Sequence, residues 1–159
     1  MWAVFAMTKS IAVKHNCSMN STLTRSVELE IANAQDILTI LRQNYGTWSA
    51  GLNQEQYRDF MQAQLQQPWS RSNFRYLVAR NGDAILSSCK LYTFDFQSRG
   101  QVYKVGGIGA VFTPENERGK GHAIDMLESV IDLAEDESFD ALLLFSDIDP
   151  LFYERLGFE

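Results

Sequence analysis

A glycine turn between a strand and a helix constrains this sequence more than any other feature. Residues 118–123 read Arg-Gly-Lys-Gly-His-Ala, between the apolar run 105–113 and an amphipathic stretch that reaches about residue 137. Glycine allows positive φ angles and close backbone approach, and the first amides of a helix have no acceptor within the helix. A helix N-terminus also carries partial positive charge, which Arg118 and Lys120 reinforce. The turn is therefore predicted to bind an anion such as a pyrophosphate.

Two common nucleotide-binding motifs do not fit this turn. The P-loop requires a glycine five residues before its Gly-Lys pair and a hydroxyl residue after it, but Pro114 and Gly121 hold these positions. The dinucleotide motif requires a third glycine where Ile124 stands. The pattern that does fit is Arg/Gln-x-x-Gly-x-Gly/Ala, matched by Arg118, Gly121 and Ala123.

This pattern and two further segments resemble the GNAT superfamily of acyl-CoA-dependent N-acyltransferases. Residues 105–113 read Val-Gly-Gly-Ile-Gly-Ala-Val-Phe-Thr, an apolar strand whose glycines predict a bulge or a ligand lying against the backbone. Residues 152–158 read Phe-Tyr-Glu-Arg-Leu-Gly-Phe, which is similar to the family's segment of that kind. The three segments stand in the family's order and spacing. The resemblance extends from about residue 27 to the end and is strongest from residue 105 onward.

The rest of the sequence fits the GNAT fold, which is of the α/β (α+β) class with a mixed, mostly antiparallel central sheet flanked by helices. Residues 27–31 alternate apolar and charged side chains, which predicts a half-buried strand. A helix follows with apolar residues 37, 38, 40 and 41 on one side. Asn53 is a plausible N-cap for a second helix, which Pro68 is expected to end.

Three strands with short turns predict an antiparallel meander. Residues 75–80 and 84–96 flank an Asn-Gly-Asp turn, a strong hairpin signal, and Ser-Arg-Gly at 98–100 leads into the strand 101–113. The helix from residue 121 to about 137 has one apolar face and one acidic face. A short buried strand at 141–145 and a short helix complete the predicted order.

The ends of the chain give separate expectations. Residues 1–24 are predicted to be an irregular leader without a function, and residues 25–159 a GNAT domain that is incomplete at its C-terminus. In the family two more strands follow the Gly-Phe segment, whereas only Gly157, Phe158 and Glu159 remain here. We therefore expect either a fragment or a sheet that another chain completes. Because an unpaired strand edge is a liability, a homodimer formed through this edge is also predicted.

Composition limits the class of protein. The 159 residues, 45% hydrophobic and 21% charged, fit one globular domain. No run approaches the roughly 20 apolar residues that cross a bilayer, so no membrane association is expected. Cys17 and Cys89 form no disulfide framework, which makes a cytoplasmic location the default. The net charge of −6 argues against general nucleic-acid binding and favours an acceptor that arrives as a cation.

The resemblance implies an N-acetyltransferase without a metal, with acetyl-CoA as its cosubstrate. The acetyl group would pass to a primary amine of a small molecule or protein by direct attack in a ternary complex. A strand amide is implied to polarise the thioester oxygen. Ser146 stands where many relatives have an Asn near the pantetheine arm. The implied coenzyme A contacts lie at the end of the strand, in the turn and after the next strand: Val111, Phe112, Thr113, Arg118, Gly119, Lys120, Gly121, His122, Ala123 and Ser146.

The resemblance also implies that Tyr153 is the acid that protonates the departing thiolate. A phenol with a pKa of about 10 can donate to a thiolate whose pKa is about 8.5. The alternative is a packing aromatic beside Phe152. Glu115, Asp147 and Asp149 are candidates for the base that deprotonates the amine, although each could equally be a turn or cap residue.

Two further functions stay open at this stage. The chain could be a catalytically silent acyl-CoA-binding or regulatory module, which binds without turnover. It could also be a structural or partner-binding fragment that does not bind coenzyme A alone. Within the acetyltransferase interpretation, residues 87–91, 111–114 and 146–150 are weakly similar to fungal enzymes that acetylate free lysine.

Overall fold

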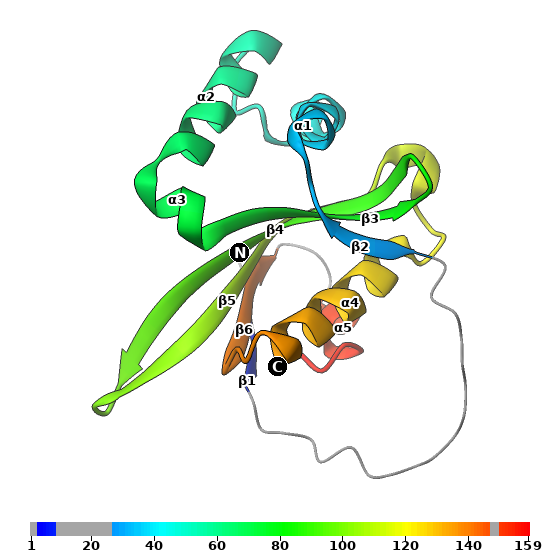
Figure 1. Ribbon diagram of the computed structural model, residues 1–159. Helices are drawn as coiled ribbons and strands as arrows, with labels where there is room; N and C mark the ends of the chain where they lie inside the picture. The colour runs from blue at the N-terminus through cyan, green and yellow to red at the C-terminus, as the bar shows by residue number, and fades with distance from the viewer. Residues whose placement is uncertain (1–2, 9–26, 147–149) are drawn as a thin grey trace.

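The computed structural model describes residues 3–8, 27–146 and 150–159, which form one sheet with helices on both faces (Figure 1). Within these residues the sheet has six strands in the order β1-β6-β5-β4-β3-β2. Only β5 and β6 are parallel, and the other neighbours are antiparallel. The predicted mixed, mostly antiparallel sheet is confirmed. Its strands are Ala3–Thr8 (β1), Glu28–Ile31 (β2), Phe74–Asn81 (β3), Ala84–Ser98 (β4), Gln101–Phe112 (β5) and Ala141–Ser146 (β6).

The helices form two layers that cover opposite faces of the sheet. One layer contains α1 (Ala34–Trp48), α2 (Gln54–Gln66) and α3 (Pro68–Asn73). The other contains α4 (His122–Asp136) and α5 (Pro150–Glu154). Figure 1 shows the first group above the sheet and α4 and α5 below it. A 3₁₀ helix at Glu115–Glu117 connects β5 to the turn before α4.

Side chains of β3 point alternately to the two faces of the sheet and contribute to a hydrophobic core on each face. Leu77 and Ala79 are buried in the cluster that contains α4, whereas Tyr76 and Val78 are buried in the cluster that contains α1 and α2. Successive side chains of a strand point to opposite faces, so a central strand covered on both sides is apolar throughout. The predicted helix at 121–137 is α4, and its apolar face is buried through Met126, Leu127, Val130 and Ala134.

The predicted N-cap at Asn53 is confirmed, and Asn33 caps the first helix in the same way. Asn33 and Asn53 each form a capping box at the start of α1 and α2, in which the cap side chain and the third helical residue satisfy each other's backbone amides. α2 ends at Gln66, as expected. Pro68 does not start a loop, because it is the first residue of the short helix α3, where its missing amide costs nothing.

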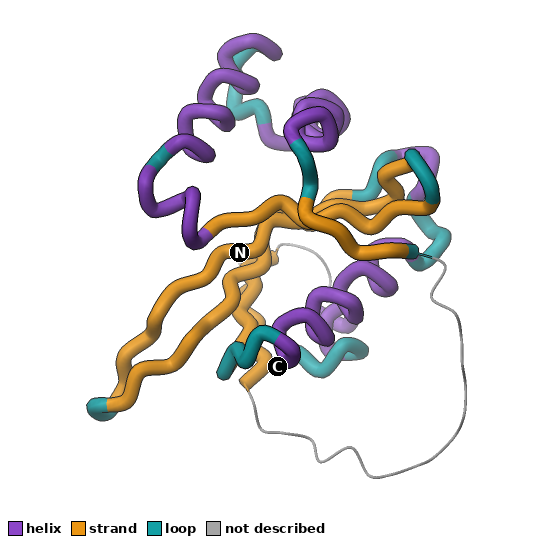
Figure 2. Tube along the Cα trace, in the orientation of Figure 1, coloured by secondary structure: helices purple, strands orange, loops and turns teal. Residues whose placement is uncertain are grey.

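The predicted hairpins are both present. Gly82 has a φ of 56° in the turn between β3 and β4, and Arg99 and Gly100 have φ of 49° and 80° in the turn between β4 and β5. Two consecutive positive φ angles match the strand twist in a two-residue hairpin turn. β4 and β5 extend together beyond the rest of the sheet, as Figure 2 shows.

The expectation for the N-terminal segment was wrong in part. Ala3–Thr8 forms a strand that pairs antiparallel with β6, from Ala3 opposite Ser146 to Thr8 opposite Ala141. The β6 edge that was expected to be unpaired is therefore hydrogen-bonded within the chain, so a second copy is not needed to pair with it. Residues 9–26, including the predicted boundary at residue 25, lie outside the described residues.

Gly106 gives a test of how tightly β5 packs against β6 and α4. A Cβ added at Gly106 would meet Leu142 Cδ2 at 2.6 Å and the Phe139 ring at 3.2 Å, whereas a Cβ at Gly46 in α1 meets nothing within 4 Å. Gly106→Ala should lower the free energy of unfolding by about 1–3 kcal/mol. Gly46→Ala should raise it by about 0.5–1 kcal/mol, because alanine loses less entropy in a helix. Urea unfolding of the two variants measures both, and equal values would contradict this packing.

Candidate active site

The site begins where β5 and β6 separate. Their parallel ladder ends at Ile108 opposite Leu144. Immediately afterwards β5 contains an extra residue relative to β4, because Gly109 pairs with Lys90 and the next pair is Phe112 with Ser88. Ala110 has a φ of 48° at this bulge. Bulges bend the strand that carries them, and beyond Ile108 no strand in the described part of the chain pairs with the β5 edge that faces β6.

The bulge that the glycines predicted is confirmed, but it is centred on an alanine. The glycines of β5 instead make room for large neighbours. A Cβ at Gly107 would lie 3.3 Å from Phe94, and one at Gly109 would lie 3.4 Å from Tyr92. These glycines therefore allow aromatic side chains of β4 to lie across the strand.

The glycine turn lies next to this gap and leaves the start of α4 open. Gly119 and Gly121 have φ of 76° and 90°, and a Cβ at either position would have open space around it. Gly121 is the N-cap of α4 and supplies no side-chain hydrogen bond, in contrast to the asparagine caps of α1 and α2. The first amides of α4 are thus available to a ligand, and its partial positive charge favours an anion.

Charged side chains around the turn are held by Glu117. Its carboxylate lies 3.0 Å from the Lys120 ammonium and 3.2 Å from His122 Nε2. The hydrogen bond from Lys120 is the main cause that lowers the pKa of Glu117 below its usual value. His122 Nδ1 is buried and has no hydrogen-bond partner among the described residues. Arg118 donates from Nε to the Thr113 carbonyl at 3.1 Å, so both ends of the turn are fixed to protein groups.

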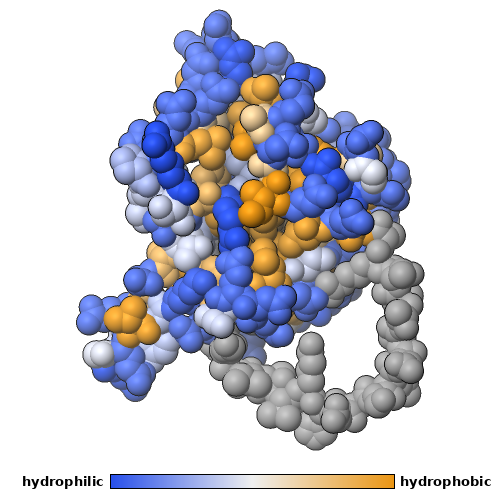
Figure 3. Space-filling view, in the orientation of Figure 1, coloured by the Kyte–Doolittle hydropathy of each residue, from blue (hydrophilic) through white to orange (hydrophobic). Residues whose placement is uncertain are grey.

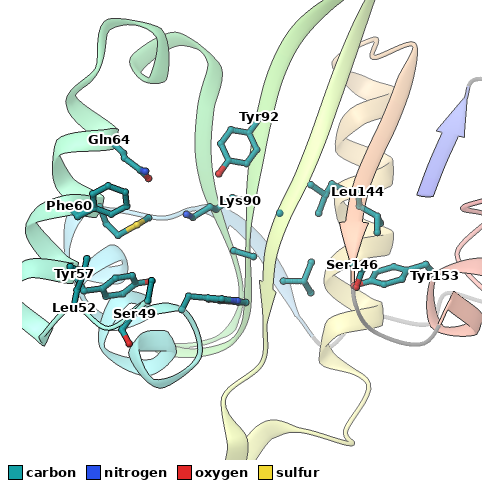
Figure 4. A pocket seen from close by; sticks show the side chains of 17 residues that line it. Ser49, Leu52, Tyr57, Phe60, Gln64, Lys90, Tyr92, Leu144, Ser146 and Tyr153 are labelled. Atoms are coloured by element: carbon teal, nitrogen blue, oxygen red, sulfur yellow. The ribbon is translucent and has the colours of Figure 1, made fainter. Parts of the chain in front are cut away.

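A cavity of about 480 Å³ lies between the first helical layer and the separated strands (Figure 4). Its volume is typical of small-molecule sites. Figure 3 shows apolar residues in the middle of an otherwise largely hydrophilic face. The helical side of the cavity consists of Trp48, Ser49, Ala50, Leu52, Tyr57, Phe60, Met61 and Gln64. The opposite side consists of Lys90, Tyr92, Ile108, Gly109, Ala110, Val111, Leu144, Ser146 and Tyr153.

Tyr153 and Ser146 meet on the β6 side of the cavity. Tyr153 belongs to α5 and is only 2% exposed, between the rings of Phe152 and Phe158. The Ser146 hydroxyl at the end of β6 donates to the Tyr153 phenol oxygen at 3.2 Å. Figure 4 shows the two side chains together across β5 from the helices. A donor to the phenol oxygen stabilises the negative charge that develops when the phenol releases its proton.

Lys90 occupies the other part of the cavity and was missed by sequence reasoning. It extends from β4 toward α2, as Figure 4 shows. Its Nζ lies 5.4 Å from the Tyr76 ring centroid and 5.8 Å from that of Phe74, near the outer limit of cation–π contact. Burial lowers the pKa of Lys90 to about 8. This shift corresponds to about 3 kcal/mol against the charged form.

Aromatic residues form the wall next to Lys90. The rings of Phe74 and Tyr92 are stacked with centroids 4.9 Å apart, and Trp69 stacks on Tyr92 at 6.5 Å. The Tyr57 hydroxyl, from α2, donates to Asn44 at 3.0 Å. Burial raises the pKa of both Tyr57 and Tyr92, so these phenols are neutral at physiological pH.

The remaining sequence candidates lie as follows. Val111 lines the cavity, whereas Phe112 is buried against Trp48 and Arg118. Ala123 is half-buried in the first turn of α4. Glu115 is exposed and does not line the cavity. Asp147 and Asp149 lie outside the described residues.

Metal-ligating side chains and Cys89 are the remaining groups of the described residues to place. They contain no cluster of His, Cys, Asp and Glu side chains that would hold a metal ion, and none of their helices has the length and apolar character to cross a bilayer. Cys89 is buried and its pKa is raised to about 12, so its thiol is not a nucleophile at neutral pH.

The charge on Lys90 predicts a pH-dependent stability difference. Between about pH 8 and 10.5 the unfolded chain binds more protons than the folded one at this residue, so stability rises with pH there; below pH 8 the full cost of the charge is present. Lys90→Met should therefore be about 1–3 kcal/mol more stable than the parent at pH 7. The difference in free energy of unfolding between Lys90→Met and the parent should decrease from pH 8 to 10.5 in urea titrations. A difference that stays constant with pH would contradict a desolvated charge at Lys90.

Comparison with solved structures supports the fold. A protein of Bacillus halodurans described as a transcriptional regulator has a TM-score of 0.65 and 20% identity, over 84% of this chain and 93% of that one. A Clostridium acetobutylicum protein described as a predicted acetyltransferase with acetyl-CoA has a TM-score of 0.63 and 15% identity, over 84% and 90%. A Trypanosoma brucei acetyltransferase has a TM-score of 0.62 and 20% identity, over 84% of this chain and 92% of that one.

A comparison with curated proteins gave no significant match. The sequence profile of the family described as "Acetyltransferase (GNAT) domain" matches residues 36–159. This match starts in the first turn of α1 and includes the bulged strand, the glycine turn and the Ser146–Tyr153 pair. The chain therefore belongs to the GNAT acetyltransferase family.

Proposed function

We propose that this protein transfers the acetyl group of acetyl-CoA to a primary amine by direct attack in a ternary complex. The observation that carries the proposal is the edge of β5 beyond Ile108, which pairs with no described strand and enters the cavity that Tyr153 lines. Such an edge suits an extended ligand, and the uncapped start of α4, a few residues further along the chain, suits an anionic group. The cavity on the helical side leaves room for a second, smaller substrate.

The proposed cosubstrate site has three parts. Amides of Gly119, Gly121 and the first turn of α4 would hold the pyrophosphate, with Arg118 and Lys120 beside it. The pantetheine arm would add to β5 at residues 111–113 like a further strand, since that edge has backbone groups to offer. Ser146 and Val111 would contact its far end, where both line the cavity.

The acetyl thioester supplies the group that is transferred, and the protein's residues promote the attack. An amide of the bulged segment would donate to the thioester oxygen, where negative charge develops. Tyr153 would protonate the departing thiolate, assisted by the hydrogen bond from Ser146. Holding both substrates together would lower the entropic part of the barrier. Asp147 and Asp149, just after β6, remain candidate bases for the amine.

A charge placed in the glycine turn tests the cosubstrate site. Gly121→Glu should abolish acetyl-CoA binding in calorimetric titration, because the carboxylate would repel the pyrophosphate and a side chain would occupy the open space at the start of α4. Gly100→Glu is a matched control: Gly100 also has a positive φ of 80° and open space, but it lies in the β4–β5 turn. It should carry similar backbone strain and bind acetyl-CoA like the parent.

The pair of variants also separates the alternative functions. Equal binding by both folded variants would contradict the assignment of the glycine turn. A parent that binds acetyl-CoA but acetylates no amine in a thiol-release assay would indicate a silent binding module, and a folded parent that does not bind it would exclude a stand-alone enzyme.

Removing one oxygen tests the assignment of Tyr153. Tyr153→Phe keeps the ring contacts with Phe152 and Phe158 but cannot supply a proton. We expect kcat to fall about 100-fold while KM for acetyl-CoA changes little, because the hydroxyl acts mainly as the thiolate departs. Steady-state kinetics measure both constants. A kcat within twofold of the parent would show that Tyr153 packs against its neighbours and does not act as the acid.

A further inference from the structure

The cavity has a distinctive charge distribution that bears on the second substrate. Lys90 is the one Lys, Arg, Asp or Glu side chain that lines its described part. No carboxylate among the described residues forms an ion pair with Lys90. The polar side chains that line the cavity near Lys90 are neutral, namely the Tyr57 and Tyr92 phenols, Ser49 and Gln64.

Lys90 is partly buried, and its ammonium has no counter-charge among the described residues, which requires an explanation. The rings of Phe74 and Tyr76 lie at 5.8 and 5.4 Å, too far to replace the hydration that burial removes. Buried charges in proteins are normally paired. The partner of Lys90 is therefore expected to arrive with a ligand, and a cavity that opens onto the ammonium gives that ligand access.

We propose that the acceptor carries a carboxylate as well as its amine, and that Lys90 binds this carboxylate. This inference rests on the proposed acetyl transfer. Lys90 lies on the side toward α2, and Tyr153 lies on the far side of β5 (Figure 4). An acceptor that spans the cavity would place its carboxylate at one end and its amine at the other, next to the thioester. Amino acids whose amine lies at the far end of a methylene chain from the carboxylate, such as lysine through its side-chain amine, have this combination of groups.

The walls of the cavity define the middle of the acceptor. Phe60, Met61, Leu52 and Tyr92 present apolar and aromatic surface between the two ends. A body of methylene groups or a ring suits this surface, because it removes apolar area from water. The net charge of −6 attracts cations at long range, but a second positive charge held next to Lys90 would be repelled. Lys90 thus selects for an anionic group at close range.

Matched compounds isolate the contribution of the carboxylate. Each of 5-aminopentanoate, 6-aminohexanoate and lysine, whose terminal amine is separated from the carboxylate by methylene groups, has a decarboxylated counterpart: butylamine, pentylamine and cadaverine. We would measure binding of each to the parent in the presence of coenzyme A, and acetylation of each with acetyl-CoA. At least one amino acid should bind about 10- to 100-fold more tightly than its amine, the range of a charge-assisted hydrogen bond. The ratio of kcat/KM values should follow the same order.

Variants at Lys90 connect the preference to this residue. Lys90→Met should reduce the preference for the amino acid to about onefold, whereas Lys90→Arg, which keeps the charge, should retain most of it. A folding defect is not expected in Lys90→Met, because removal of a desolvated charge should keep or raise the melting temperature. Its affinity for acetyl-CoA should equal that of the parent.

The outcomes distinguish this inference from the proposed function. Equal or weaker binding of all three amino acids relative to their amines would overturn the inference, and so would a preference that survives in Lys90→Met. Acetylation of the amines alone would leave the acetyltransferase assignment intact. Selective binding of an amino acid without acetylation would support the carboxylate contact while it contradicts the transfer reaction.

Discussion

The separation of β5 from β6 beyond Ile108 and Leu144 is the feature on which the rest of the site depends. The bulge at Ala110 bends β5 at this point and leaves one edge of the strand without a neighbour in the described sheet. Such an edge is usually a liability. In this protein it lies between the open start of α4 and Tyr153, where an extended ligand can complete it.

The glycine turn and the cavity differ in whether a carboxylate lies next to their basic side chains. At the glycine turn, Glu117 contacts both the Lys120 ammonium and His122 Nε2, so these side chains are already positioned by a carboxylate. In the cavity, Lys90 has no such carboxylate among the described residues, and burial disfavours its charge. A protein that retains a buried charge at a cost in stability commonly does so for function. This contrast supports the proposal that Lys90 binds a substrate group.

Much of the fold could be predicted because its signals are local. The hairpin turns, the Asn53 cap and the apolar face of α4 each depend on residues that are close in the sequence. The glycine turn and Tyr153 were found from their spacing and their resemblance to the family. Pro68 was correctly expected to end α2, but the short helix that it begins was not predicted, because the sequence around a proline does not show whether a new helix follows.

The features that sequence reasoning missed depend on contacts between distant segments. β1 pairs with β6 across more than 130 residues, and no local pattern in residues 3–8 indicates that partner. Lys90 is one of several polar residues in a strand until α2 and β5 enclose it. The absence of a carboxylate around it in the described cavity is a property of the assembled fold. A single cation in an alternating strand would ordinarily be read as solvent-exposed.

The most direct test of this account is backbone hydrogen exchange with and without acetyl-CoA. Acetyl-CoA should slow exchange in residues 109–113 and 119–124, the unpaired strand edge and the start of α4, and leave exchange in the β4–β5 turn at 98–101 unchanged. Binding without protection of these two segments, or with protection confined to other parts of the chain, would contradict this account.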